Sequence, residues 1–82
     1  MKTYGVLVVD DSALMRKSIS ALIESHPEFY VIGKARNGID ALEKIKLLRP
    51  ALVTMDIEMP EMNGIEAVQH IMEYDPVAVI VI

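Results

Sequence analysis

The sequence predicts an α/β domain built on a parallel sheet, and three observations support this. Short, continuous apolar runs rich in β-branched residues recur along the chain, and amphipathic helical patterns lie between them. Strands and helices therefore alternate from the first run to the last, which calls for right-handed crossovers between parallel strands. The 82 residues suffice for one small domain and are too few for a catalytic domain beside a regulatory one.

The predicted strands are runs in which apolar residues are continuous rather than alternating, as expected of strands covered on both faces. They lie at residues 6–9, 29–32, 51–55 and 77–82. The second run is the weakest; it follows Pro27 and precedes Gly33.

Three helices are predicted between these strands. Ser12 and Asn37 are suited to cap the first two, because their side chains accept hydrogen bonds from N–H groups of the first turn. Pro50 ends the second helix, and Asn63-Gly64 opens the third. The side chains expected to face inward are Met15, Ile19, Leu22 and Ile23, then Ile39, Leu42, Ile45 and Leu48, then Ile65, Val68, Ile71 and Met72.

The composition excludes several classes of function. Eight Lys and Arg against twelve Asp and Glu give a net charge of −4, the opposite of a nucleic-acid module, so no direct nucleic-acid partner is expected. The absence of cysteine excludes disulfides, thiolate zinc sites and thiol nucleophiles. The first apolar run is too short for a signal peptide or a membrane span. We therefore expect a cytoplasmic protein with no membrane partner.

Acidic residues directly follow two of the predicted strands. Asp10 and Asp11 come after the first strand, and Asp56 comes after the third. Ligands of open parallel sheets bind beyond the carboxyl ends of the strands, so the three carboxylates converge if these strands are neighbours. Such a group is suited to Mg²⁺, which prefers oxygen ligands. The alternative is that each acid merely caps the following helix in water.

A carboxylate beside a divalent cation is also a plausible nucleophile toward a phosphoryl group. Aspartate is already ionised at neutral pH and needs no general base. Its obstacle is repulsion from an anionic phosphoryl donor, which Mg²⁺ relieves. The product of such an attack is an aspartyl phosphate.

The chain resembles the receiver domain of two-component response regulators. The resemblance rests on residues 6–12, 35–38, Ala41-Leu42 and 53–64, and it covers essentially the whole chain. It implies a flavodoxin-like fold, with strand order 2-1-3-4 for the strands present here. Residues 10–17 and 56–60 are similar to the N-terminal receiver of the chemotaxis protein-glutamate methylesterases.

The resemblance implies a role for each acidic position. Asp56 matches the phosphoacceptor, and Asp10 and Asp11 match the acidic pair, with Asp11 the more direct Mg²⁺ ligand. Glu58 occupies the position whose backbone carbonyl binds the ion. The implied phosphodonor is a histidine kinase, and the implied target is an output domain or partner protein. In the methylesterases, phosphorylation relieves the receiver's blockade of a C-terminal esterase domain.

The sequence departs from the family pattern at its C-terminal end. We interpret residues 1–82 as a single truncated receiver domain that ends after the fourth strand, before the family's Ser or Thr, its Lys and its fifth strand. We therefore expect weakened phosphorylation and lost switching. The apolar strand at 77–82 also predicts self-association through an exposed sheet edge, as a homodimer or domain swap, or through a partner chain.

Other functions remain open at this stage. One is an inactive structural half-domain. Another is a Mg²⁺-dependent aspartyl phosphatase, in which Glu58 would act as the acid and base and the pair Asp10 and Asp11 would have no place. A nucleotide or flavin binder lacks the required Gly-rich phosphate loop.

The remaining polar and sulfur-bearing residues are interpreted as structural. His26 and His70 lack metal-ligand spacing, and Arg16 and Lys17 form a solvated helix face. The methionines near Asp56 are expected to fill gaps in packing; they are Met55, Met59 and Met62. Met59 and Met62 also flank an exposed loop, so a contact role stays open for these two.

Overall fold

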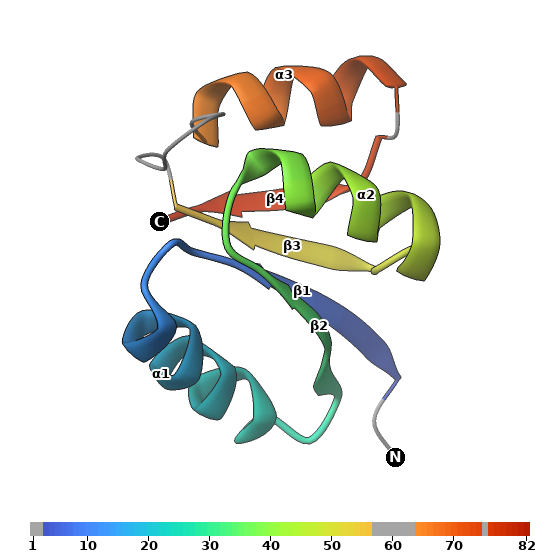
Figure 1. Ribbon diagram of the computed structural model, residues 1–82. Coiled ribbons are helices and arrows are strands. Elements are labelled where there is room, and N and C mark those ends of the chain that lie inside the picture. The colour runs from blue at the N-terminus through green and yellow to red at the C-terminus, as the bar shows by residue number, and fades with distance from the viewer. Residues whose placement is uncertain (1–2, 57–63, 75) are drawn as a thin grey trace.

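Four strands and three helices alternate in the computed structural model, which describes residues 3–56, 64–74 and 76–82 (Figure 1). In chain order they are β1 (Tyr4–Val9), α1 (Ala13–Glu24), β2 (Phe29–Ala35), α2 (Gly38–Leu48), β3 (Leu52–Met55), α3 (Gly64–Tyr74) and β4 (Ala78–Val81). This is the predicted order. None of the helices in the described residues is long and apolar enough to cross a membrane.

The described strands form one parallel sheet in the order β2-β1-β3-β4, which confirms the predicted arrangement. β1 lies between β2 and β3, so the first and third strands are neighbours. α1 covers one face of the sheet, and α2 and α3 lie together on the other (Figure 1). The carboxyl ends of all four strands therefore meet at one edge.

The sheet and the helices α2 and α3 enclose the main core. Its fully buried members come from both sides of that layer: Leu7, Val9, Val53 and Met55 from the strands, and Ala41, Ala67 and Ile71 from the helices. Val6 and Val8 alternate with this set along β1 and are buried on the α1 face. β1 is thus covered on both faces, which explains its continuous apolar sequence.

β2 is longer than predicted, because it runs through Gly33 to Ala35. The register with β1 shifts at Ile32, where a bulge allows the strand to continue. A Cβ added at Gly33 would lie 2.6 Å from Cδ1 of Leu48. Glycine at this position therefore leaves room for the Leu48 side chain of α2, and does not end the strand.

The predicted inward faces of the helices were partly wrong. Ile45 and Ile71 are buried, and Ile19, Ile23, Leu42, Leu48 and Val68 are half-buried, as expected. Five residues predicted to face inward are exposed, namely Met15, Leu22, Ile39, Ile65 and Met72. Each helix also buries a small residue that was not predicted to face inward: Ser20 in α1, Ala41 in α2 and Ala67 in α3. Small side chains let each helix approach the sheet closely, and the larger residues flank that line of contact.

Side chains from both neighbouring helices reach the backbone of the edge strand β2. The carboxylate of Glu24 in α1 accepts a hydrogen bond from the Val31 N–H at 3.0 Å. On the other side, the ammonium of Lys44 in α2 donates to the Lys34 carbonyl and lies 3.3 Å from the Asp40 carboxylate. Parts of this edge are therefore already hydrogen-bonded within the chain.

Candidate metal centre

The pairing of β1 with β3 brings the predicted acidic residues together. Val9, the last residue of β1, is in register with Met55, the last residue of β3. Backbone hydrogen bonds extend the sheet one residue further, because the Asp56 N–H donates to the Val9 carbonyl at 3.0 Å. The Asp10 N–H likewise donates to the Ala35 carbonyl of β2 at 3.0 Å. Hydrogen bonds to neighbouring strands therefore fix the backbone of both Asp10 and Asp56.

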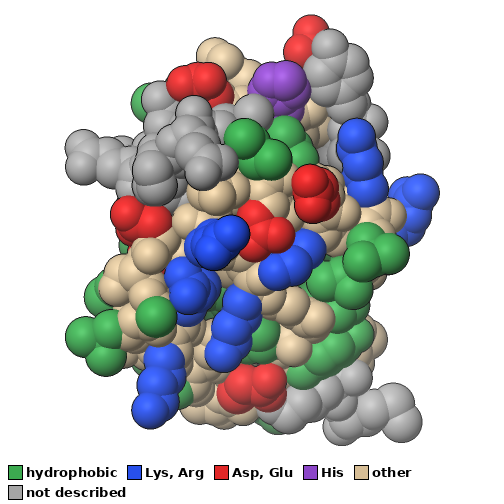
Figure 2. Space-filling view, viewed as in Figure 1, with side chains coloured by type: hydrophobic (Ala, Val, Ile, Leu, Met, Phe, Trp, Pro, Cys, Tyr) green, Lys and Arg blue, Asp and Glu red, His purple; other side chains and the backbone are tan. Residues whose placement is uncertain are grey.

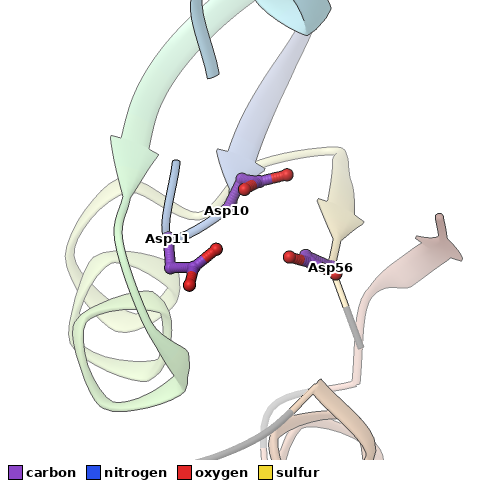
Figure 3. Close-up of side chains that lie close together, drawn as sticks. All are labelled: Asp10, Asp11 and Asp56. Carbon is purple, nitrogen blue, oxygen red and sulfur yellow. The ribbon is translucent and has the colours of Figure 1, made fainter. Parts of the chain in front are cut away.

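Carboxylate oxygens of Asp10, Asp11 and Asp56 all lie within 4.8 Å of one another. The first two side chains come from the connection between β1 and α1, the third comes from the end of β3, and all three border the same space (Figure 3). Asp10 is buried, Asp56 is half-buried and Asp11 is exposed. Among the described residues, this is the only cluster of three or more groups able to hold a metal ion.

The chemistry of this donor set fits a hard divalent cation. Three like charges this close repel one another, and a shared cation removes that repulsion. Carboxylate oxygens are the ligands that Mg²⁺ prefers, and Mg²⁺ commonly uses few protein ligands and keeps several waters. Asp10 and Asp11 are the residues that would hold it together with Asp56.

The Asp10 side chain is oriented by the loop that follows it. Its Oδ1 accepts a hydrogen bond from the Ser12 N–H at 2.9 Å. Ser12 is also the N-cap of α1, as predicted, and its Oγ accepts from the Met15 N–H at 3.2 Å. The start of the helix and the orientation of one candidate ligand therefore depend on the same short segment.

Arg16 belongs to the site, and the prediction of a solvated helix face was wrong for this residue. It is half-buried, and its guanidinium Nη1 donates to the backbone carbonyl of Asp10 at 2.7 Å. The sequence did hold a sign of this contact. Arg16 lies one turn after the N-cap Ser12, so its side chain can reach back to the loop that contains Asp10. Lys17 is exposed, as expected.

Other predicted residues have structural surroundings or lie outside the described part. Nδ1 of His26 accepts the Glu28 N–H at 3.1 Å, and the His26 ring packs on Phe29. Met55 is fully buried in the core, in agreement with a packing role. Glu58, whose carbonyl was predicted to bind the metal, lies outside the described residues, as do Met59 and Met62.

A protein-family model described as the response regulator receiver domain matches residues 6–82. The chain belongs to this family. Receiver domains bind Mg²⁺ at an acidic pocket of this kind, take phosphoryl groups from histidine kinases and regulate output domains. Among the described residues of this receiver, the acidic cluster consists of Asp10, Asp11 and Asp56.

Curated relatives of the receiver are named protein-glutamate methylesterase/protein-glutamine glutaminase. The relative from Geobacillus kaustophilus is 60% identical over 82 residues, which are 100% of this chain and 24% of that protein. The relative from Thermotoga maritima is 51% identical over 81 residues, which are 99% of this chain and 24% of that protein. The receiver thus spans about a quarter of the length of the curated relatives it matches.

Solved structures confirm the flavodoxin-like fold of the receiver. The crystal structure of the response regulator domain of Thermotoga maritima CheB matches with a TM-score of 0.94 and 49% identity, over 98% of this chain and 60% of that one. A CheX-CheY-BeF₃-Mg²⁺ complex from Borrelia burgdorferi matches with a TM-score of 0.90 and 37% identity, over 98% of this chain and 61% of that one. The predicted resemblance to methylesterase receivers is confirmed.

Proposed function

We propose that this receiver accepts a phosphoryl group on Asp56 from the phosphohistidine of a histidine kinase. The observation that supports this most directly is the convergence of three carboxylates within 4.8 Å at the carboxyl edge of the sheet. Three carboxylates this close are suited to phosphoryl transfer if one of them is the nucleophile and the other two bind a cation. In the transfer, a carboxylate oxygen of Asp56 bonds to phosphorus as the phosphorus–nitrogen bond of the donor breaks.

The chain's own residues divide the work of this reaction. Asp10, held by the Ser12 N–H, and exposed Asp11 are the proposed cation ligands, with the Glu58 carbonyl as a further one. Mg²⁺, when bound, neutralises the negative charge that accumulates on the transferred phosphoryl oxygens. The hydrogen bond from the Asp56 N–H to Val9 fixes the nucleophile's backbone to the neighbouring strand. The related complex that contains BeF₃ and Mg²⁺ is consistent with this division.

We further propose that phosphorylation of this receiver regulates a methylesterase output domain. The support is the name shared by the curated relatives, of whose length the chain spans about a quarter. The remaining length of those relatives leaves room for an output domain. A receiver of chemotaxis type would then convert kinase activity into control of protein-glutamate methylesterase activity.

Intact-mass spectrometry after incubation with acetyl phosphate and Mg²⁺ tests the acceptor. We expect a gain of one phosphoryl group that disappears when the metal is chelated and when Asp56 is replaced in Asp56→Asn. The matched control is Glu73→Gln, which removes one exposed acidic charge on α3 and should be phosphorylated normally.

The outcomes separate this proposal from a phosphatase. Persistent phosphorylation of Asp56→Asn, or phosphorylation without any divalent cation, would contradict the proposed site. Rapid turnover of a phosphomonoester such as p-nitrophenyl phosphate would instead favour a phosphatase. A folded chain that gains no mass would show that these residues alone do not form an acceptor.

A further inference from the structure

Charge is distributed unevenly along this acidic chain. Residues 1–49 contain all eight Lys and Arg together with six Asp and Glu, whereas residues 50–82 contain six Asp and Glu and no basic residue. In the structure, the basic residues that are described lie in α1, in β2, in the connection after β2, and in α2 with its C-cap. In the view of Figure 2, Lys and Arg side chains lie over α1, β2 and α2, with a smaller number of Asp and Glu side chains among them.

Most of the described Lys and Arg side chains have no partner among the described residues. Arg16 bonds the Asp10 carbonyl, and Lys44 pairs with Asp40. The other five are exposed and form no side-chain hydrogen bond or ion pair with any described residue; they are Lys17, Lys34, Arg36, Lys46 and Arg49. We call these five residues the β2-side basic patch. Unpaired like charges on one face attract an anionic partner even though the whole chain is negative.

We propose that the β2-side basic patch is a docking surface for an acidic, partly apolar segment of another protein. This surface is distinct from the carboxylate cluster, so it gives the receiver a second point of contact. The proposal concerns where a partner docks and does not depend on phosphorylation of Asp56.

An apolar side chain beside the patch favours a peptide partner. Ile39 of α2 is 44% exposed and lines a surface hollow together with Arg36 of the patch. A protein segment with alternating acidic and apolar residues satisfies both kinds of side chain. A nucleic acid presents a longer, uniformly charged backbone, which the acidic half of the chain, residues 50–82, would repel.

The partner is expected to bind through side chains and not by adding a strand to the sheet. β2 is an edge strand, but its Val31 N–H is bonded to Glu24 and its Lys34 carbonyl to Lys44. The bulge at Ile32 interrupts the regular spacing that an added strand needs. Electrostatic attraction is therefore the main source of affinity, which makes binding sensitive to salt.

Nuclear magnetic resonance of the isotope-labelled chain tests the proposal with two synthetic peptides. The first repeats the triplet Glu-Glu-Leu, and the matched control repeats Gln-Gln-Leu. We expect the acidic peptide, but not the control peptide, to shift the amide resonances of β2, α2 and the first turns of α1. The affinity of the chain for the acidic peptide should fall as salt is added. The double variant Lys34→Gln/Arg36→Gln should lower that affinity about five-fold, because each exposed charge contributes modestly.

A single variant controls for net charge. Gln69 belongs to α3, away from the patch, and is exposed. Gln69→Glu, compared with the single variant Lys34→Gln, gives the same net charge with the change placed elsewhere. Equal loss of affinity in these two variants, or peptide-induced shifts outside the patch, overturns the proposal. So does tighter binding of duplex DNA or of phosphatidylserine vesicles than of the acidic peptide.

Discussion

The guanidinium of Arg16 donates a hydrogen bond to the main-chain carbonyl of Asp10 at 2.7 Å, from one turn inside the following helix. The carboxylate of the same aspartate accepts the Ser12 N–H at 2.9 Å. Asp10 is therefore held at both its backbone and its side chain, while Asp11 is exposed. The two neighbouring aspartates therefore differ in conformational freedom. Hydrogen bonds within the loop orient Asp10, whereas the exposed Asp11 side chain is able to adjust to a ligand.

Removing the Arg16 contact should loosen the proposed metal site without removing a ligand. We expect Arg16→Ala to weaken Mg²⁺ binding about ten-fold or more, because a hydrogen bond from a charged donor contributes ~1.5–3 kcal/mol. Calorimetric titration measures the affinity. Lys17→Ala, at the exposed neighbouring position, should bind Mg²⁺ like the unaltered chain. Equal affinity for all three proteins would show that Arg16 does not position Asp10.

Neutralising one member of the carboxylate cluster should stabilise the chain when no metal is present. Asp11→Asn removes a repulsion on the order of 1 kcal/mol between charges this close. The same change should abolish most of the stabilisation that added Mg²⁺ gives the unaltered chain, because a ligand that binds only the folded state raises its stability. Thermal unfolding with and without Mg²⁺ measures both effects. Glu73→Gln is the control, and a similar response there would argue against a specific site.

Truncation of Leu7 should strongly lower the free energy of unfolding. It is 0% exposed at the centre of β1 and belongs to the core between the sheet and α2 and α3. We expect Leu7→Ala to cost 2–5 kcal/mol of unfolding free energy, roughly the range for deleting a buried leucine side chain. Leu47→Ala makes the same chemical change on an exposed helix surface and should cost little. Denaturant titration compares the two variants.

The hydroxyl of Thr54 is an unusual feature of the third strand. It is buried, and among the described residues its Oγ1 has no hydrogen-bond partner. Thr54→Val keeps the shape and removes the unsatisfied hydroxyl, so we expect a gain of about 1 kcal/mol in unfolding free energy. Thr54→Ser keeps the hydroxyl and loses a buried methyl, and it should destabilise by about the same amount. If Thr54→Val were the less stable of the two, the hydroxyl would have a partner in solution.

The strands and the acidic residues that follow them could be predicted because both depend on local sequence signals. Continuous apolar runs identify strands covered on both faces, and Asp10, Asp11 and Asp56 directly follow two of them. The resemblance to receivers then supplied the order that makes β1 and β3 neighbours. Local signals therefore predicted where the strands and acids lie along the chain, and the resemblance predicted that the acids meet.

What the sequence did not reveal depends on how elements approach one another. Leu22 was predicted to face inward from its spacing, yet it is 76% exposed, because α1 approaches the sheet at Ser20. Gly33 resembled a strand end, but it continues β2 and admits Leu48 of α2. Arg16 has the sequence pattern of an ordinary surface charge, but its guanidinium contacts the Asp10 carbonyl in the loop before α1. In each case a pairwise contact decided the outcome.

The pairing of β1 with β3 also has a kinetic consequence. Asp10 and Asp56 are distant in sequence, and β2 with two helices forms the connection between their strands. Closing so long a loop is slower than forming a local helix or hairpin. During refolding, helical signal should therefore appear before the ability to bind a metal ion. The onset of metal binding during refolding should therefore mark the moment at which β1 and β3 pair.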